Sequence, residues 1–193
     1  MTTNKTLYIL LTDTGTVLPK LIKWYTKKRY NHVSISFDES LREVYSFGRK
    51  HMKNPFSGGF VRENTREGLF KEASCAVYSI TITEKQLDKI QNYIKMMEEN
   101  KDCYRYNFLG LFGFMFQRPI KRDNALFCSQ FVATALQLGG VLEKDKEPAL
   151  TTPSDIQEHE ALELVYEGKL NQYLEEEKIE FFNISPELES VYV

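Results

Sequence analysis

Cys128 and His32 are the residues whose types and positions suit nucleophilic chemistry. Cys128 stands near the start of a predicted apolar helix, in the stretch NALFCSQFVATALQLGG at 124–140. The free N–H groups and the positive dipole end of a helix N-terminus favour a thiolate, and one such N–H can stabilise an oxyanion. Cys128 is therefore a candidate nucleophile. A small buried core residue beside Phe127 and Phe131 is the alternative for the same cysteine.

His32 is the candidate general base because it opens a predicted strand on its polar face. In HVSISF the residues Val33, Ile35 and Phe37 alternate with His32, Ser34 and Ser36. Small serines beside the imidazole leave room for a helix or a substrate to approach it. A strand-end histidine bonded to a loop carbonyl remains the alternative.

The hydrophobic periodicity predicts the elements that must bring these two side chains together. Alternation and turn residues indicate a β-hairpin over 32–48, and Thr83 with Gln86 forms a capping-box pattern for a helix ending near Asn100. The cysteine helix is expected to begin near Asn124 and to stop at Gly139 and Gly140, with Phe127, Phe131, Ala135 and Leu138 buried. Further elements are predicted as strands over 6–12, 75–82, 162–168 and 179–184, a helix over 18–28, and a turn with a helix cap over 151–155.

Residues 49–64 are rich in glycine, asparagine and charge, which indicates an excursion over the surface or a lid. The chain has no visible repeat or domain boundary. We therefore expect one α+β domain over residues 1–193.

Composition narrows the classes of function. The 193 residues are 42% hydrophobic and carry a net charge of -2, which argues against a nucleic-acid partner. The longest apolar run, FLGLFGFMF, is well short of the roughly 18 residues of a membrane span. The first residues lack a signal-peptide pattern, so a soluble, cytoplasmic protein with no integral membrane segment is expected.

Cysteines and histidines show no metal-site or disulfide spacing. Cys75, Cys103 and Cys128 form no C-x-x-C pair, and His32, His51 and His159 form no H-E-x-x-H cluster. Neither a metal nor another cofactor is expected.

Several stretches, taken in order, resemble the permuted branch of the papain-like NlpC/P60 superfamily, which includes the YiiX-like hydrolases and, more distantly, lecithin–retinol acyltransferase. They are YNHVSISFD followed by EVYSFG, then LFCSQFVATALQLGG, then TTPSDI, and they span roughly residues 6–168. In this branch the histidine strand precedes the cysteine helix, as His32 precedes Cys128. The resemblance implies a small antiparallel sheet packed on the cysteine helix, with Cys128 as nucleophile and His32 as base.

The resemblance also implies a polar residue on the following strand that orients the imidazole. Arg42, Val44 and Ser46 share the face of His32 by alternation, so Ser46 is the candidate. YiiX-like sequences often carry a glutamate at this place. Glu43 is the nearby carboxylate, but it reaches that face only if a bulge intervenes.

The function expected from these residues is hydrolysis of an amide or ester through a thioacyl intermediate. The expected partner is a peptide, amide or acyl-ester substrate. Three alternatives stay open: a catalytically weak or inactive papain-like binding module, suggested by the missing carboxylate at Ser46; a lipid or amine acyltransferase; and a structural protein in which Cys128 only packs. The sequence leaves the oligomeric state open.

Overall fold

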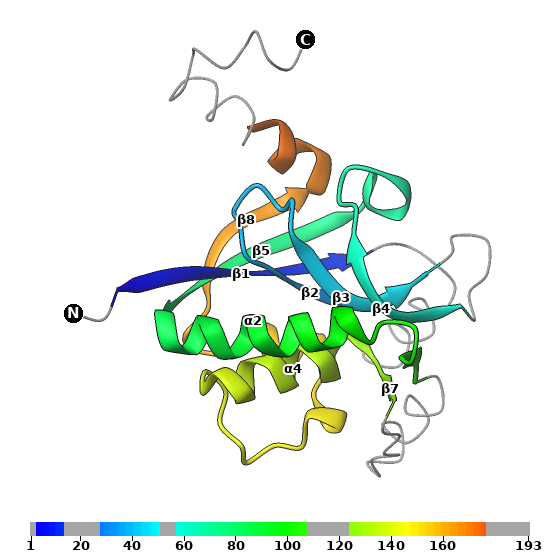
Figure 1. Ribbon diagram of the computed structural model, residues 1–193. Helices are drawn as coiled ribbons and strands as arrows, with labels where there is room; N and C mark the ends of the chain where they lie inside the picture. The colour runs from blue at the N-terminus through cyan, green and yellow to red at the C-terminus, as the bar shows by residue number, and fades with distance from the viewer. Residues whose placement is uncertain (1–2, 14–27, 51–56, 108–123, 177–193) are drawn as a thin grey trace, which may run out of the picture.

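The computed structural model describes residues 3–13, 28–50, 57–107 and 124–176. In these residues, helices pack against an antiparallel sheet (Figure 1). Six strands in this part of the chain form one sheet in the order β4-β3-β2-β1-β5-β8. Their bounds are β1 Asn4–Asp13, β2 His32–Ser36, β3 Val44–Arg49, β4 Gly58–Glu63, β5 Ser74–Thr83 and β8 Glu163–Lys169. The α+β class expected from the sequence is therefore confirmed.

All neighbouring strands of this sheet run antiparallel. The central strand β1 pairs with β2 on one side and with β5 on the other. The predicted hairpin is confirmed, because Ile35 faces Tyr45 and Ser36 faces Val44 across β2 and β3. The strands predicted over 6–12, 75–82 and 162–168 correspond to β1, β5 and β8 with slightly different ends.

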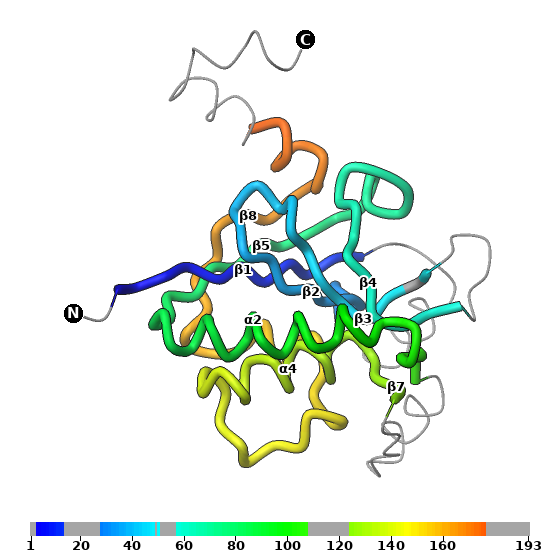
Figure 2. The backbone as a smooth tube through the Cα atoms, in the orientation of Figure 1, coloured from blue at the N-terminus to red at the C-terminus, as the bar shows by residue number. Residues whose placement is uncertain are grey.

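Each face of the sheet is covered by its own apolar cluster. On one face, α2 (Glu84–Glu99) and α4 (Cys128–Gly139) lie side by side under the strands (Figures 1 and 2). The other face packs against a helical segment over residues 170–176. Val33, Ile35 and Phe47 belong to the cluster on the α2 and α4 face, whereas Leu10 and Val44 belong to the opposite one.

Local capping explains where three of the helices begin or end. Thr83 and Gln86 form the predicted capping box of α2, whose C-cap is Asn100. Thr152 and Asp155 form a second box for the short helix α5 (Pro153–Gln157), as the turn and cap prediction over 151–155 requires. α4 ends at Gly140, whose φ of 72° is a left-handed conformation that glycine adopts without a side-chain clash.

Two details of the cysteine helix differ from the prediction. Residues 125–126 form strand β7, which pairs with β6 (Arg105–Tyr106), so α4 begins at Cys128 instead of near Asn124. Strand pairing thus overrides the capping preference of Asn124. Leu138 is 47% exposed and does not belong to the buried stripe, because this position faces away from the sheet.

The predicted surface excursion over residues 49–64 is wrong for residues 58–63. Residues 58–63 are strand β4, which pairs with β3 at the edge of the sheet. The tight approach of β6 requires the glycines, since a Cβ at Gly59 would lie 2.5 Å from the Tyr104 carbonyl oxygen. Glycine here therefore marks close packing against a neighbouring strand. Residues 51–56 of the predicted excursion or lid lie outside the described residues.

Two of the predicted elements lie on residues that the structure does not describe. The helix over 18–28, apart from Lys28, and the strand over 179–184 lie outside the described ranges.

None of the helices in the described ranges combines the length and apolar character needed to cross a membrane. Within the same ranges, His, Cys, Asp and Glu side chains do not gather in groups of three suited to a metal ion.

Candidate active site

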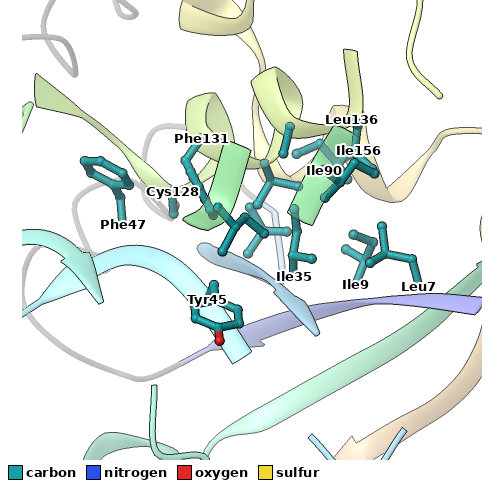
Figure 3. Close-up of a cluster of buried hydrophobic side chains, with 14 of the residues drawn as sticks. Leu7, Ile9, Ile35, Tyr45, Phe47, Ile90, Cys128, Phe131, Leu136 and Ile156 are labelled. Carbon is teal, nitrogen blue, oxygen red and sulfur yellow. The ribbon is translucent and has the colours of Figure 1, made fainter. Parts of the chain in front are cut away.

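Cys128 is the first residue of α4. Its side chain belongs to the large apolar cluster and is 5% exposed, and Figure 3 shows it beside Phe47 and Phe131. Among the described residues, no side chain caps the N-terminus of α4. The first-turn N–H groups of a helix have no partner within the helix, so those beside the thiol can donate to a group from outside it.

The start of α4 is held by the next residue in the chain. The Ser129 hydroxyl donates to the Thr151 carbonyl oxygen at 2.5 Å, and this contact is buried. Thr151 directly precedes Thr152, the N-cap of α5. The two sequence stretches CSQ and TTPSD therefore meet, and together they position the thiol-bearing turn.

His32 begins β2 and is nearly enclosed. Its side chain is 14% exposed, and its ring lies 6.4 Å from the ring of Phe70 in the connection between β4 and β5. Its Nε2 atom is 2.7 Å from Glu63 Oε1. The imidazole thus has a carboxylate partner that lies 31 positions away in the sequence.

Glu63 is a candidate site residue that the sequence analysis missed. It ends β4 and is 5% exposed, and both of its carboxylate oxygens accept hydrogen bonds from serines: Ser34 donates to Oε2 at 3.0 Å, and Ser46 donates to Oε1. Gly48 leaves the space for it, since a Cβ there would lie 3.1 Å from Glu63 Oε1. The sequence carried little signal for it, because FVRE is two apolar residues followed by two charged ones and shows no alternation that would mark a strand.

Electrostatics favour the charged forms of both partners. Burial alone lowers the pKa of His32, but attraction to Glu63 and a hydrogen bond with Cys128 outweigh it and hold this pKa well above its ordinary value. Burial would raise the pKa of Glu63, yet attraction to His32 and hydrogen bonds from His32, Ser46 and Ser34 lower it. The pair is therefore an imidazolium beside a carboxylate.

Cys128 and His32 interact although they belong to different sides of the sheet. Cys128 packs on the helix side, whereas alternation directs the His32 side chain toward the opposite face of β2. In the described residues β2 and β3 pair only at Ile35 with Tyr45 and at Ser36 with Val44. The Cys128 thiol nevertheless contributes to the raised pKa of the His32 imidazole.

The fold thus brings some of the candidate residues from the sequence into one site and leaves others outside it. Cys128 lies close enough to His32 to raise the pKa of the imidazole. Ser46 is linked to His32 through Glu63, because Ser46 donates a hydrogen bond to Glu63 and Glu63 in turn bonds His32 Nε2. Glu43 is half-exposed and lies 3.4 Å from Arg62 in an ion pair on the surface.

The other two cysteines have different surroundings. Cys75 is buried in β5, and burial raises its pKa to about 12. Cys103 is exposed. Neither begins a helix, and both serve as references for the reactivity of Cys128.

Comparison with known proteins returns no match: no family model, no curated protein and no solved structure matches this chain. The geometry of the site is therefore the basis for its proposed function.

Proposed function

We propose that the protein is a cysteine-dependent acyl hydrolase in which Cys128 is the nucleophile, His32 is the general base and Glu63 orients His32. The single observation that carries this proposal is the buried pair of His32 and Glu63, with Ser34 and Ser46 on the carboxylate and with Cys128 close enough to raise the pKa of His32. An imidazolium beside a cysteine favours the thiolate, which is the nucleophilic form.

The reaction follows from the order of these groups. The Cys128 thiolate, whose proton resides on the His32 imidazolium, attacks the carbonyl carbon of an amide or ester. The tetrahedral oxyanion collapses, the leaving amine or alcohol takes the proton from His32, and a thioester remains on Cys128. His32 then removes a proton from water, which attacks the thioester; the acid leaves, and the Cys128 thiolate beside the His32 imidazolium is restored.

Two parts of the site support the charged steps. Glu63 accepts from Nε2, which leaves Nδ1 of His32 as the nitrogen that exchanges a proton with sulfur, and its charge stabilises the imidazolium. The uncapped N–H groups at the start of α4 are donors for the oxyanion.

The fold that fits this proposal is the permuted papain-like arrangement. An antiparallel sheet packs against the cysteine-bearing helix α4, and the histidine strand precedes that helix in the chain. Both features support the relationship to YiiX-like hydrolases that the sequence stretches indicate. Peptides, amides and acyl esters remain the substrate classes, and an added amine or lipid that intercepts the thioester would make the protein an acyltransferase.

The binding-module alternative loses the observation that motivated it. It was based on the missing carboxylate at Ser46, and Glu63 supplies a carboxylate to His32 from the next strand. No other feature of the described site favours a binding module over an enzyme.

The test is alkylation of the native protein by iodoacetamide at about pH 6 and pH 8.5, with each cysteine quantified by peptide mass spectrometry. An ordinary thiol is almost wholly protonated at about pH 6. We expect Cys128, although buried, to react at pH 6 faster than the exposed Cys103, while Cys75 remains unmodified.

Two variants decide whether the reactivity comes from the site. His32→Ala should remove the excess reactivity of Cys128 at pH 6, whereas His159→Ala, which changes a histidine after α5, should retain it. A Cys128 that reacts no faster than Cys75 in the wild type would overturn the proposed function.

A further inference from the structure

A pocket lined by arginines lies beside the candidate active site. It has a volume of about 260 Å³ and forms where the ends of β3 and β4 meet the turns that flank them. Its lining includes Leu41, Arg42, Arg62, Glu63, Thr65 and Arg66. Glu63 is therefore shared between this pocket and the chain of hydrogen bonds to His32.

The charges around the pocket favour an anion. Burial and repulsion from Arg42 lower the pKa of Arg66 and outweigh its attraction to Asp38, so the two guanidinium groups lie close enough to repel each other. Arg62 pairs with Glu43 only at 3.4 Å and at half-exposed positions, where an ion pair contributes little. The carboxylate of Glu63 already accepts from His32, Ser34 and Ser46, so its charge is balanced within the site.

The wall of the pocket is held in a fixed shape. Asp38 accepts from the backbone N–H groups of Arg42 and Glu43, which folds the loop between β2 and β3. Thr65 and Arg66 both donate to the carbonyl oxygen of Leu41, a buried residue with a left-handed φ of 51°. A pocket preorganised in this way can bind a small group with little loss of conformational freedom.

We propose that this pocket binds a carboxylate or phosphate group carried by the substrate of Cys128. A guanidinium presents N–H donors in a fork that matches either group. The volume is below the roughly 300–1,000 Å³ of sites that enclose a whole drug-sized ligand, so the pocket fits one anionic group and the bond to be cleaved lies outside it. That the bound anionic group belongs to a substrate of Cys128 rests on the proposed function. The anion site itself does not depend on it.

The anion site is tested first with inorganic phosphate as the probe, by calorimetry and by NMR of the arginine side chains. We expect phosphate to perturb the Arg42, Arg62 and Arg66 signals, and the double variant Arg42→Gln/Arg62→Gln to weaken binding by at least about tenfold. The matched control is Lys89→Gln/Lys95→Gln, which removes two exposed charges from α2 and should bind phosphate like the wild type. Equal affinity in the arginine variant and the wild type, or equal weakening in the control, would overturn the inference.

A second experiment, the substrate arm of the test, compares kcat/KM for three thioesters of the same length that end in a carboxylate, a phosphate or a methyl group. We expect kcat/KM to be higher for one of the anionic thioesters than for the methyl one, and the ratio to fall at least about tenfold in Arg42→Gln/Arg62→Gln. The better anionic ending identifies which group the substrate carries.

The two arms separate failure of the inference from failure of the proposed function. Phosphate binding at the arginines with an unreactive Cys128 rejects the hydrolase and leaves an anion site. A reactive Cys128 with no difference among the three thioesters rejects the anionic substrate group and leaves the hydrolase.

Discussion

Glu63 is the residue on which the proposed chemistry depends most directly after Cys128 and His32. Replacement by glutamine keeps the shape of the side chain but removes the charge that holds the pKa of His32 high. We expect Glu63→Gln to lower the His32 pKa, measured by NMR, and to reduce Cys128 alkylation at about pH 6 by tenfold or more.

Glu43→Gln is the matched control for this change. Glu43 is the neighbouring carboxylate considered from the sequence, but it is half-exposed and pairs with Arg62. Its replacement should leave both the His32 pKa and the alkylation rate close to those of the wild type. Similar losses in the two variants would contradict the assignment of Glu63.

Gly48 provides a second prediction for a single residue. A Cβ at this position would lie 3.1 Å from Glu63 Oε1 and 3.3 Å from Ser46 Oγ, so Gly48→Ala should displace the carboxylate and slow Cys128 alkylation severalfold. Gly140→Ala is the control, because a Cβ there meets no described atom within 4 Å, although its φ of 72° is unfavourable for alanine. We expect Gly140→Ala to cost about 1 kcal/mol of stability and to retain the alkylation rate.

At the scale of elements, the start of α4 depends on its contact with the stretch before α5. Ser129→Ala leaves the buried Thr151 carbonyl without its hydroxyl donor, which should cost about 1–3 kcal/mol in urea unfolding. The same change should slow Cys128 alkylation, since the thiol is carried by the turn that this bond holds.

Thr134→Ala is the comparison within the same helix. The Thr134 hydroxyl bonds the Gln130 carbonyl oxygen at 2.8 Å, but that carbonyl also accepts within the helix ladder. Its removal should cost less than the loss of the Ser129 hydroxyl and leave alkylation unaffected. If both variants lose the same stability and the same reactivity, the contact with Thr151 does not position the thiol.

At the scale of the whole molecule, the His32 and Glu63 pair links stability to pH. The pKa of His32 is raised on folding, so its contribution is complete below the unfolded value of about 6.5 and is lost as pH rises through the folded value. The pKa of Glu63 is lowered, so its contribution is complete above about 4.3 and is lost as pH falls through the folded value.

Stability from this pair should therefore be greatest between about pH 4.3 and 6.5. We expect the free energy of unfolding in urea to fall by about 1 kcal/mol or more on the alkaline side as His32 loses its proton, and this fall to be smaller in Glu63→Gln. A wild type and a variant with parallel pH profiles would show that the two groups do not form the charged pair.

The sequence by itself determined the features that depend on neighbours along the chain. Alternation produced the β2 and β3 hairpin, Thr83 with Gln86 marked the start of α2, and the two glycines marked the end of α4, because caps and strand faces follow from local geometry. Cys128 and His32 could be chosen for the same reason, since each has a chemically distinctive type at the end of an element.

Only the tertiary structure decided what meets these residues. Glu63 reaches His32 through the pairing of β3 with β4, and α4 begins at Cys128 because β7 pairs with β6. The arginine pocket likewise joins two turns that are separate in the sequence. Strand register and packing join residues far apart in the chain, and the free energy of those long-range contacts outweighs the local preferences that a sequence pattern records.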